Sequence, residues 1–453
     1  MYYNNHRQRT YTLILILLLS FNVGICQIPE PLKKEIQYRV KNQINPSIAV
    51  GLTDSTGTHF YIHGWSDLKK QIKADKYSLY ELGSITKAFT GLLLAKFAVQ
   101  DSLNLLTPAD RFLPDSINLK DKKGNQVTLK SLATHSSGLP RLPANLNVTN
   151  QFDPYANYDQ CSMYSFLGHY IPRTVGKNFE YSNLGFGVLG DALSNYKQTP
   201  YRSLIQNQIL NPLHLKNTYF KVPTANSSHM AKGYLGTQEV PLWQFQVMDA
   251  AGGLKASIGD LHQFGQHFID NASSFAEIDA IATKSHYTDQ DGNHYGLGWF
   301  IGEQETVFHG GGTGGFRTFI AIDLKNDRVI SVMSNSGSST IEDLAKYLIN
   351  PKAYPLRIDK EEVSITEDQL KPYQGFYIND GLGLNYTIVL KNNHLHAQLN
   401  QQPEFPLFYQ GKDRFIYKVV KAEVVFEKDE NNTVVGLLLN QNGQEIQFVK
   451  TNP

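Results

Sequence analysis

The most restrictive feature of this sequence is a nearly uniform apolar stretch near its first quarter. Residues 82–95 include Ile85, Phe89 and the run 92–94, and they contain no acidic side chain. A helix of that composition has no charged face to leave in water, so the stretch predicts a helix that starts at Ser84 and is buried on all sides. Such a helix needs a large core around it. The 453 residues, 41% of them hydrophobic, can supply that core, and the length suggests two or three domains.

The charge balance and the cysteine count limit the partners and the means of stabilisation. Lys and Arg number 42 and Asp and Glu 41, so the formal net charge is +1. Because no global positive field exists, we expect neither nucleic acid nor an anionic membrane surface as a partner. The two cysteines, Cys26 and Cys161, can form at most one disulfide, which excludes a disulfide scaffold.

The first residues predict export. Two arginines precede an apolar run at 13–19, the pattern of a secretory signal peptide over residues 1–26. The alternative of a transmembrane anchor needs about 20 apolar residues, and this run is shorter. We therefore expect a secreted or periplasmic protein with no membrane span in its mature form. Lipid attachment at Cys26 is a further alternative, although Ile25 before it is bulkier than the small residue that is normal there.

Helix and strand patterns alternate between residues 27 and 355. Apolar residues recur every four positions at the start, at Leu32, Ile36, Val40 and Ile44. This spacing predicts an amphipathic helix. Strand-forming runs at 47–52 and 59–62 flank a polar turn, which predicts a β-hairpin. The mixture indicates an α/β (α+β) domain over residues 27–355.

The end of the chain has a different character. Residues 356–371 are rich in charge and predict a linker. Beyond them, short β-rich runs are separated by turn signals, at 384–390, 414–417, 423–426 and 433–438. This pattern predicts a small antiparallel barrel or sandwich over residues 372–453. His394 and His396 would share one strand face, but no third metal ligand is evident, so a solvated strand face is the simpler interpretation.

Ser84 and Lys87 could form a nucleophile and a base. Three positions apart on a helix, they lie on one face, one turn apart, where hydroxyl and amine can hydrogen-bond. The N–H groups at a helix start favour an oxyanion, and a lysine stem buried among apolar residues should have a lowered pKa. The alternative is that Ser84 only caps the helix and Lys87 lies on the surface, because Ser-x-x-Lys also occurs by chance.

Two later segments carry chemistry that fits this pair. Tyr181 and Asn183 occupy a loop before an apolar helix, and we expect both to point to one side of that loop. His309 is followed by three glycines and then, from Thr313 to Ile322, by an expected strand. A substrate backbone could lie against that side-chain-free stretch.

In this order, Ser84-x-x-Lys87, Tyr181-x-Asn183 and His309-Gly-Gly resemble the motifs of the penicillin-recognising serine hydrolases. The similarity is to the branch of class C β-lactamases and low-molecular-weight penicillin-binding proteins. Residues 132–140, Leu-Ala-Thr-His-Ser-Ser-Gly-Leu-Pro, and residues 251–254, Ala-Gly-Gly-Leu, also resemble segments of that branch. The C-terminal β-rich part is similar to a lipocalin-like module found on such hydrolases.

The resemblance implies a fold and a set of roles. The fold is an antiparallel sheet flanked by helices, with an all-helical subdomain. Ser84 would attack a carbonyl, the Lys87/Tyr181 pair would take its proton, and Asn183 would orient Lys87 and the substrate amide. The backbone N–H groups of Ser84 and Gly312 would hold the oxyanion, and Gly310, Gly311 and Arg317 would contact substrate. No cofactor or metal is implied, and the expected partner is a small-molecule or peptide substrate.

His309 departs from the branch's usual Lys-Thr-Gly motif. A histidine with an ordinary pKa of about 6.5 is mostly neutral at pH 7.5, so it holds a substrate carboxylate less well than lysine. Arg317 could replace that anchor if it faces the site. The substrate therefore stays open among β-lactams, D-amino-acid peptides and esters. The alternatives are a D-Ala-D-Ala carboxypeptidase, D-aminopeptidase or esterase with little β-lactamase activity, and a slowly deacylating penicillin-binding sensor or binding module.

Overall fold

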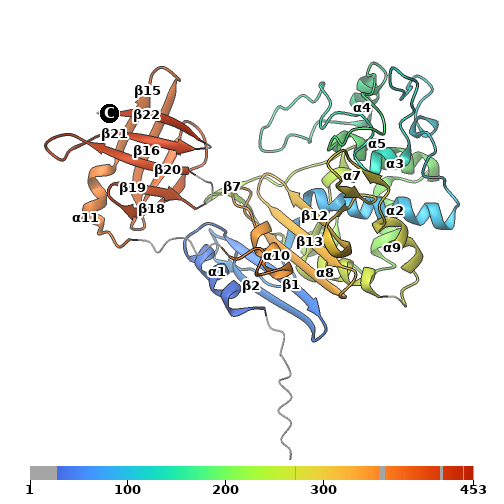
Figure 1. Cartoon of the computed structure of the whole chain (residues 1–453), viewed down its shortest axis with the longest axis horizontal. Helices are drawn as coiled ribbons and strands as arrows, with labels where there is room; N and C mark the ends of the chain where they lie inside the picture. Colours follow the sequence, from blue (N-terminus) through green and yellow to red (C-terminus); the bar gives the residue numbers. More distant parts are fainter. Residues whose placement is uncertain (1–27, 271, 357–362, 419–421, 442, 452–453) are drawn as a thin grey trace, which may run out of the picture.

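The computed structural model describes residues 28–270, 272–356, 363–418, 422–441 and 443–451. The predicted signal peptide lies outside these residues. Figure 1 shows a large mixed domain with a helical lobe at its top and a separate β-barrel formed by the C-terminal residues. Among the described residues, no helix has the length and apolar character that crossing a membrane requires.

A nine-stranded antiparallel sheet forms the centre of the large domain, with the order β3-β2-β1-β14-β13-β12-β11-β10-β9. Its strands are β1 Ser47–Asp54, β2 Gly57–Asp67, β3 Ile72–Lys73, β9 Tyr287–Thr288, β10 His294–Tyr295, β11 Phe300–Ile301, β12 Thr306–Gly312, β13 Arg317–Asp323 and β14 Arg328–Ser334. The predicted hairpin is β1 and β2, with Ala49 opposite Ile62. β1 also pairs with β14, Ile48 opposite Ser334, so the two ends of the domain meet in mid-sheet.

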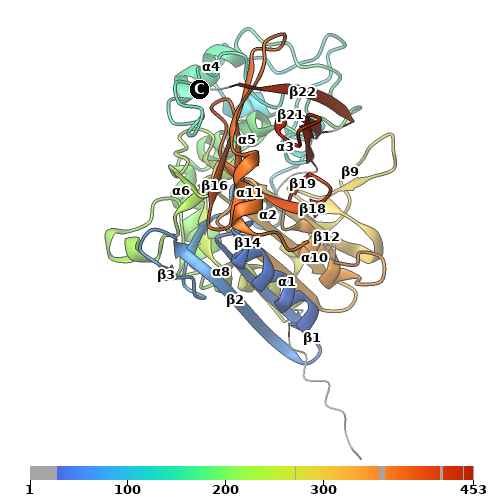
Figure 2. The same cartoon turned by 90° about the vertical axis from the view of Figure 1, so that its left-hand side faces the viewer.

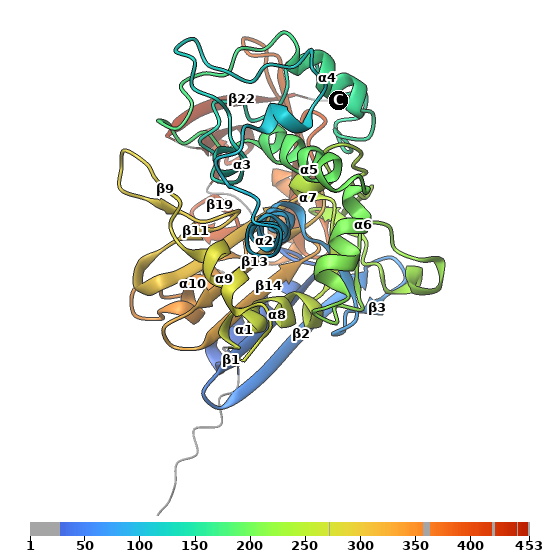
Figure 3. The same ribbon diagram turned by 90° about the vertical axis from the view of Figure 1, so that its right-hand side faces the viewer.

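Helices cover both faces of this sheet. On one face lie α1 (Glu30–Lys41) and α10 (Glu342–Ile349), visible in Figure 2, and they bury Ile48 and Val50 of β1. On the other lie α8 (Ile258–Gln266) and α9 (Ala276–Thr283), visible in Figure 3. Ala49 belongs to that second core, as the alternation of side chains along a strand requires. The amphipathic opening helix is confirmed for Leu32 and Ile36, which are buried, but it ends at Lys41, before Ile44.

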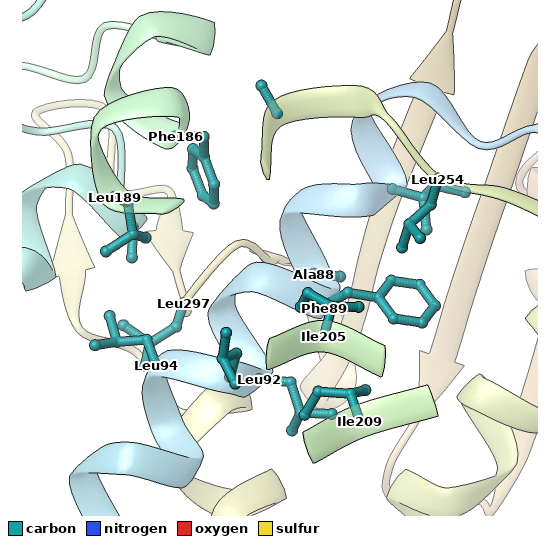
Figure 4. Close-up of a cluster of buried hydrophobic side chains, with 14 of the residues drawn as sticks. Ala88, Phe89, Leu92, Leu94, Phe186, Leu189, Ile205, Ile209, Leu254 and Leu297 are labelled. Carbon is teal, nitrogen blue, oxygen red and sulfur yellow. The ribbon is translucent and has the colours of Figure 1, made fainter. Parts of the chain in front are cut away.

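The predicted buried helix is α2 (Thr86–Gln100), which begins after a 3-10 turn, η1 (Gly83–Ile85), so Ser84 lies in the turn. Residues Thr86 to Phe97 are all buried. Figure 4 shows Phe89 and Leu92 among side chains from the surrounding helices, and Phe89 stacks on Phe264 with ring centroids 3.7 Å apart. The sheet, the helical lobe and α8 all pack around α2, which therefore places Ser84 at the centre of the domain.

The remaining elements of the domain are short. The helices are α3 Leu129–Ala133, α4 Gln160–Leu167, α5 Asn183–Lys197, α6 Tyr201–Ile205 and α7 Asp249–Gly252, with single turns η2 Ala109–Phe112, η3 Gln206–Leu210, η4 Thr224–His229, η5 His267–Ile269 and η6 Glu303–Glu305. Two small sheets have the orders β4-β8-β5 and β6-β7. Their strands are β4 Leu79–Glu81, β5 Thr218–Tyr219, β6 Gly233–Leu235, β7 Gln238–Val240 and β8 Lys255–Ser257.

The C-terminal part is a closed antiparallel barrel, which decides between the two predicted architectures. Its strands are β15 Gly375–Asn379, β16 Leu384–Lys391, β17 His394–Leu399, β18 Phe405–Gly411, β19 Arg414–Tyr417, β20 Ala422–Lys428, β21 Val434–Gln441 and β22 Gln444–Thr451. β15 pairs with β22 to close it, and buried side chains such as Phe415 and Phe448 fill the interior. His396 is buried and lies 3.1 Å from Glu404, so the solvated strand face expected there is wrong for this residue.

The expected linker is shorter in the structure than the sequence suggested. Residues 357–362 lie outside the description, but 367–370 form α11 (Glu367–Leu370), followed by the turn η7 (Lys371–Tyr373). Leu370 and Tyr373 are buried in the barrel core. The charged residues around Leu370 made this segment look like a linker, whereas Leu370 packs against side chains that only the closed barrel brings together.

Candidate active site

Glycines bring β12 against the turn that carries Ser84. A side chain at Gly311 would start 2.0 Å from Leu82 O, and one at Gly83, whose φ is +52°, would start 2.8 Å from Gly312 N. Only residues without a Cβ allow the two backbones to approach so closely. Thr318 Oγ1 also donates to Leu82 O at 2.8 Å. The backbone of Gly312 therefore lies beside η1, as the predicted oxyanion pair requires.

Lys87 lies beside Ser84 in a fully buried position. Its Nζ is 3.0 Å from Ser84 Oγ and 2.7 Å from the carbonyl oxygen of Ala251. The side chain is 0% exposed, and burial, assisted by the charge of Arg141, holds its pKa well below the ordinary value. The N-cap of α2 is Ile85. The alternative of a capping serine with a surface lysine is therefore wrong.

Tyr181 completes a three-residue cluster. It precedes the N-cap of α5, Ser182, whose hydroxyl accepts from Gly185 N. Lys87 Nζ lies 4.9 Å from the centroid of the Tyr181 ring. Burial raises the pKa of Tyr181 to about 12, although a hydrogen bond with Ser84 and the charge of Arg141 work in the opposite direction. Tyr181 is thus a protonated phenol at neutral pH, beside the serine and the lysine amine.

Asn183 begins α5 and holds a different partner from the expected one. Its Nδ2 donates to the Tyr155 hydroxyl at 2.9 Å, and its buried Oδ1 has no partner among the described residues. The second contact of Lys87 is Ala251 O. The backbone at Ala251, rather than Asn183, therefore orients the amine here. The amide of Asn183 retains a free acceptor, and its contact with substrate stays a prediction.

His309 lies within β12 and is only 2% exposed. The strand expected from Thr313 to Ile322 begins only at Arg317, because residues 313–316 form the turn that joins β12 to β13. The Nδ1 of His309 is 2.7 Å from Gly310 O, and a carbonyl can only accept, so Nδ1 carries the proton. Nε2 is buried without a partner among the described residues. Burial and the neighbouring Lys87 lower the pKa of His309 to about 3, far below the ordinary value assumed from sequence.

Sequence reasoning missed His135 as a part of this site. Its ring stacks on Tyr181 with centroids 4.3 Å apart, and Ser182 N donates to its Nδ1 at 3.0 Å. Nδ1 therefore accepts, and in the neutral ring Nε2 carries the proton, the reverse of His309. Burial holds the pKa of His135 well below its ordinary value. Its place in the segment 132–140 was a signal of resemblance, but nothing in the sequence indicated contact with Tyr181.

Arg317 and the remaining glycines support the turn after β12. Arg317 Nη1 donates to Thr313 O and Phe316 O, both at 2.9 Å, and lies 3.1 Å from where a Gly312 side chain would begin. The guanidinium thus lies beside the site but is held by backbone carbonyls. A side chain at Gly310 would start 3.4 Å from Glu342 Oε1. Contacts of Gly310, Gly311 and Arg317 with substrate remain predictions.

No group of three or more His, Cys, Asp or Glu side chains suited to a metal ion occurs in the described part of the chain. The chemical groups that do converge are a hydroxyl, a buried amine and a phenol, with backbone N–H groups beside them. Such a set can activate a serine, stabilise a negative oxygen and move protons without a further group.

Comparison with known proteins agrees with this geometry. The profile of the family described as Beta-lactamase matches residues 32–354. "Protein flp" of Staphylococcus aureus (strain MRSA252) is 30% identical over 305 residues, 64% of this chain and 60% of that protein. The "Beta-lactamase" of Lysobacter lactamgenus is 26% identical over 269 residues, 57% of this chain and 66% of that protein. The chain thus spans less than two thirds of the length of these relatives.

Two solved structures share the fold. The octameric penicillin-binding protein homologue from Pyrococcus abyssi has a TM-score of 0.65 at 21% identity and covers 93% of this chain and 99% of its own. That coverage is too large to omit the C-terminal barrel. The class C beta-lactamase from Rhodobacter sphaeroides has a TM-score of 0.61 at 21% identity, over 71% of this chain and 100% of its own.

Proposed function

Because the chain belongs to the Beta-lactamase family over residues 32–354, we propose that it is an exported serine hydrolase that cleaves an amide, β-lactam or ester bond through an acyl-enzyme on Ser84. One observation carries this proposal. Ser84 Oγ lies 3.0 Å from the Nζ of Lys87, a lysine whose complete burial lowers its pKa, and the same Nζ lies 4.9 Å from the centroid of the Tyr181 ring. A serine that served only to start a helix would not need a buried lysine amine beside it.

Acylation begins with the serine proton. The uncharged form of Lys87 accepts that proton as Ser84 Oγ attacks the carbonyl carbon, and Tyr181 stabilises the transfer as part of one coupled unit. The carbonyl oxygen becomes an oxyanion between the N–H groups of Ser84 and Gly312. Loss of one such donor typically costs about 3–4 kcal/mol of transition-state stabilisation. Tyr181 then passes a proton to the leaving group, which completes the acyl-enzyme.

Deacylation uses the same groups in reverse. Water attacks the ester carbon, its proton moves to the Lys87/Tyr181 pair, and Ser84 leaves as the hydroxyl. The unpartnered acceptor of Asn183 and the unprotonated Nε2 of His309 face no competing donor among the described residues. Both atoms can accept a hydrogen bond from a substrate N–H or from the water.

The substrate is either a β-lactam or a D-amino-acid peptide or ester that the site hydrolyses with little β-lactamase activity. Within these candidates, the buried and uncharged His309 favours an ester or a peptide without a free carboxylate at the leaving group. It leaves the position of the usual lysine without a cation for the carboxylate that β-lactams and D-Ala-D-Ala peptides both carry. A sensor or binding module that deacylates slowly has the same acylation chemistry. Turnover on nitrocefin, 4-nitrophenyl butyrate and a D-Ala-D-Ala peptide, measured together, separates these candidates, since a stoichiometric burst on all three without turnover indicates the sensor.

Loss of the nucleophile provides the direct test. Ser84→Ala should abolish covalent labelling by a fluorophosphonate probe and by a fluorescent penicillin. Ser55→Ala, at an exposed turn, is the matched control and should label like the unmodified protein. Labelling of Ser84→Ala at the control level would refute Ser84 as nucleophile. Fractionation of an expressing bacterium tests export, with a product shortened by about 26 residues in the periplasm or medium as the expected outcome.

A further inference from the structure

The cations around Ser84 differ in whether their charge is available to a substrate. Lys87, His135 and His309 are buried, and burial lowers the pKa of each. The permanent charges beside the cluster are the guanidinium groups of Arg141 and Arg317. Arg317 is half-buried and uses Nη1 on two backbone carbonyls, and the charge of Glu342 acts on it. The remaining positive charge is therefore that of Arg141.

Arg141 is held at the site through its backbone while its side chain stays exposed. Its carbonyl oxygen accepts from Asn183 N at 3.0 Å and from Leu184 N at 3.3 Å, which ties it to the start of α5. Its guanidinium carbon lies 5.0 Å from the centroid of the Tyr181 ring. Within the described residues, no carboxylate forms an ion pair with it, so its charge is uncompensated beside a catalytic side chain.

We propose that Arg141 recognises a negatively charged group on the acyl side of the substrate, which makes this an anion-selective hydrolase. The inference rests on the function proposed for Ser84. The acyl side follows from the tie between Arg141 and Asn183, because Asn183 is the side chain expected to orient the substrate amide, and a group beside it meets the part of the substrate that stays on Ser84. A planar guanidinium held by stacking matches a carboxylate in a two-point contact, which a lysine ammonium cannot reproduce. The positive charge beside Ser84 therefore comes from Arg141, next to the start of α5, and not from His309 in β12.

Two esters of equal chain length test this selectivity. Mono-4-nitrophenyl glutarate carries a carboxylate at the end of its acyl chain, and 4-nitrophenyl pentanoate ends in a methyl group. In the full-length protein, Arg141→Gln should lower kcat/KM for the glutarate ester about tenfold more than for the pentanoate ester, through KM. The part of the loss that both esters share reports the charge that Arg141 exerts on Lys87 and Tyr181. Arg141→Lys should recover only part of the loss. Raising the ionic strength should lower the kcat/KM of the unmodified protein for the glutarate ester and leave that for the pentanoate ester unchanged.

The control separates recognition from other effects. Arg111→Gln removes another exposed guanidinium, which lies on η2 without a hydrogen bond among the described residues, and should leave both esters unaffected. An equal loss on both esters in Arg141→Gln would overturn the proposal, because it would mean that Arg141 acts through Tyr181 or through stability. No loss on the glutarate ester would overturn it as well. The function of Ser84 is tested separately by an uncharged fluorophosphonate, since failure to label the unmodified protein refutes the hydrolase itself.

Discussion

Acidification should destabilise the large domain while most of its carboxylates are still charged, because histidines such as His262 and His309 are buried as neutral rings. His262 lies under the sheet, with its ring nitrogens 2.7 Å from the hydroxyls of Thr53 and Ser331. Burial lowers its pKa to about 3, as it does for His309. In the unfolded chain each ring titrates near its ordinary pKa of about 6.5.

The sign follows from where the protons bind. Between about pH 6.5 and 3 the unfolded chain holds these two protons and the folded chain does not, so the stability is fully present above pH 6.5 and falls as the pH drops through that window. At pH 5.0 each histidine lowers the free energy of unfolding by about 2 kcal/mol relative to pH 7.5. Both together remove about 4 kcal/mol, a large part of the roughly 5–15 kcal/mol typical of a domain.

Urea unfolding between pH 7.5 and 5.0 measures this loss. Tryptophan fluorescence reports on the large domain alone, because all three tryptophans, Trp65, Trp243 and Trp299, precede the barrel. His262→Gln keeps a hydrogen-bonding side chain without a titrating ring. We expect its loss of stability between pH 7.5 and 5.0 to be smaller by about 2 kcal/mol. His214→Gln, at an exposed position, is the control. The same loss in the unmodified protein and in His262→Gln would refute the reasoning.

Two further predictions concern packing. Gly91→Ala should destabilise the domain by about 3 kcal/mol in thermal unfolding, because its Cβ would start 1.8 Å from Leu297 O. The control Gly259→Ala, whose Cβ would meet nothing closer than 3.7 Å, should be neutral or slightly stabilising. Equal effects of the two substitutions would contradict this. Lys418→Met should not weaken the barrel's contact with α1. Lys418 Nζ lies 4.3 Å from the Tyr38 ring centroid without a hydrogen-bond acceptor among the described residues, and burial lowers its pKa to about 8. Removing this charge should add at most about 1 kcal/mol of stability near pH 7, a gain that shrinks as the pH rises from 8 to 10; destabilisation by Met would contradict it.

Local patterns predicted those parts of the molecule whose cause is local. The hairpin of β1 and β2, the opening helix α1 and the strands of the barrel were all visible as periodicity and turn signals. Barrel closure was not, because the pairing of Phe376 with Thr451 joins residues far apart in sequence. The linker was misjudged for the same reason, since the burial of Leu370 depends on strands that come after it.

The sequence alone indicated which chemical groups the site contains and that Ser84 and Lys87 lie within one turn of each other, because their spacing sets their direction along a helix. Tertiary structure decided their chemical state. Burial of Lys87, His309 and Tyr181 moves each pKa away from its ordinary value, and burial is a property of everything packed around α2. It also placed His135 against Tyr181 and left the charge of Arg141 free. Solvation and electrostatic interaction depend on distances in space, which a linear pattern does not contain.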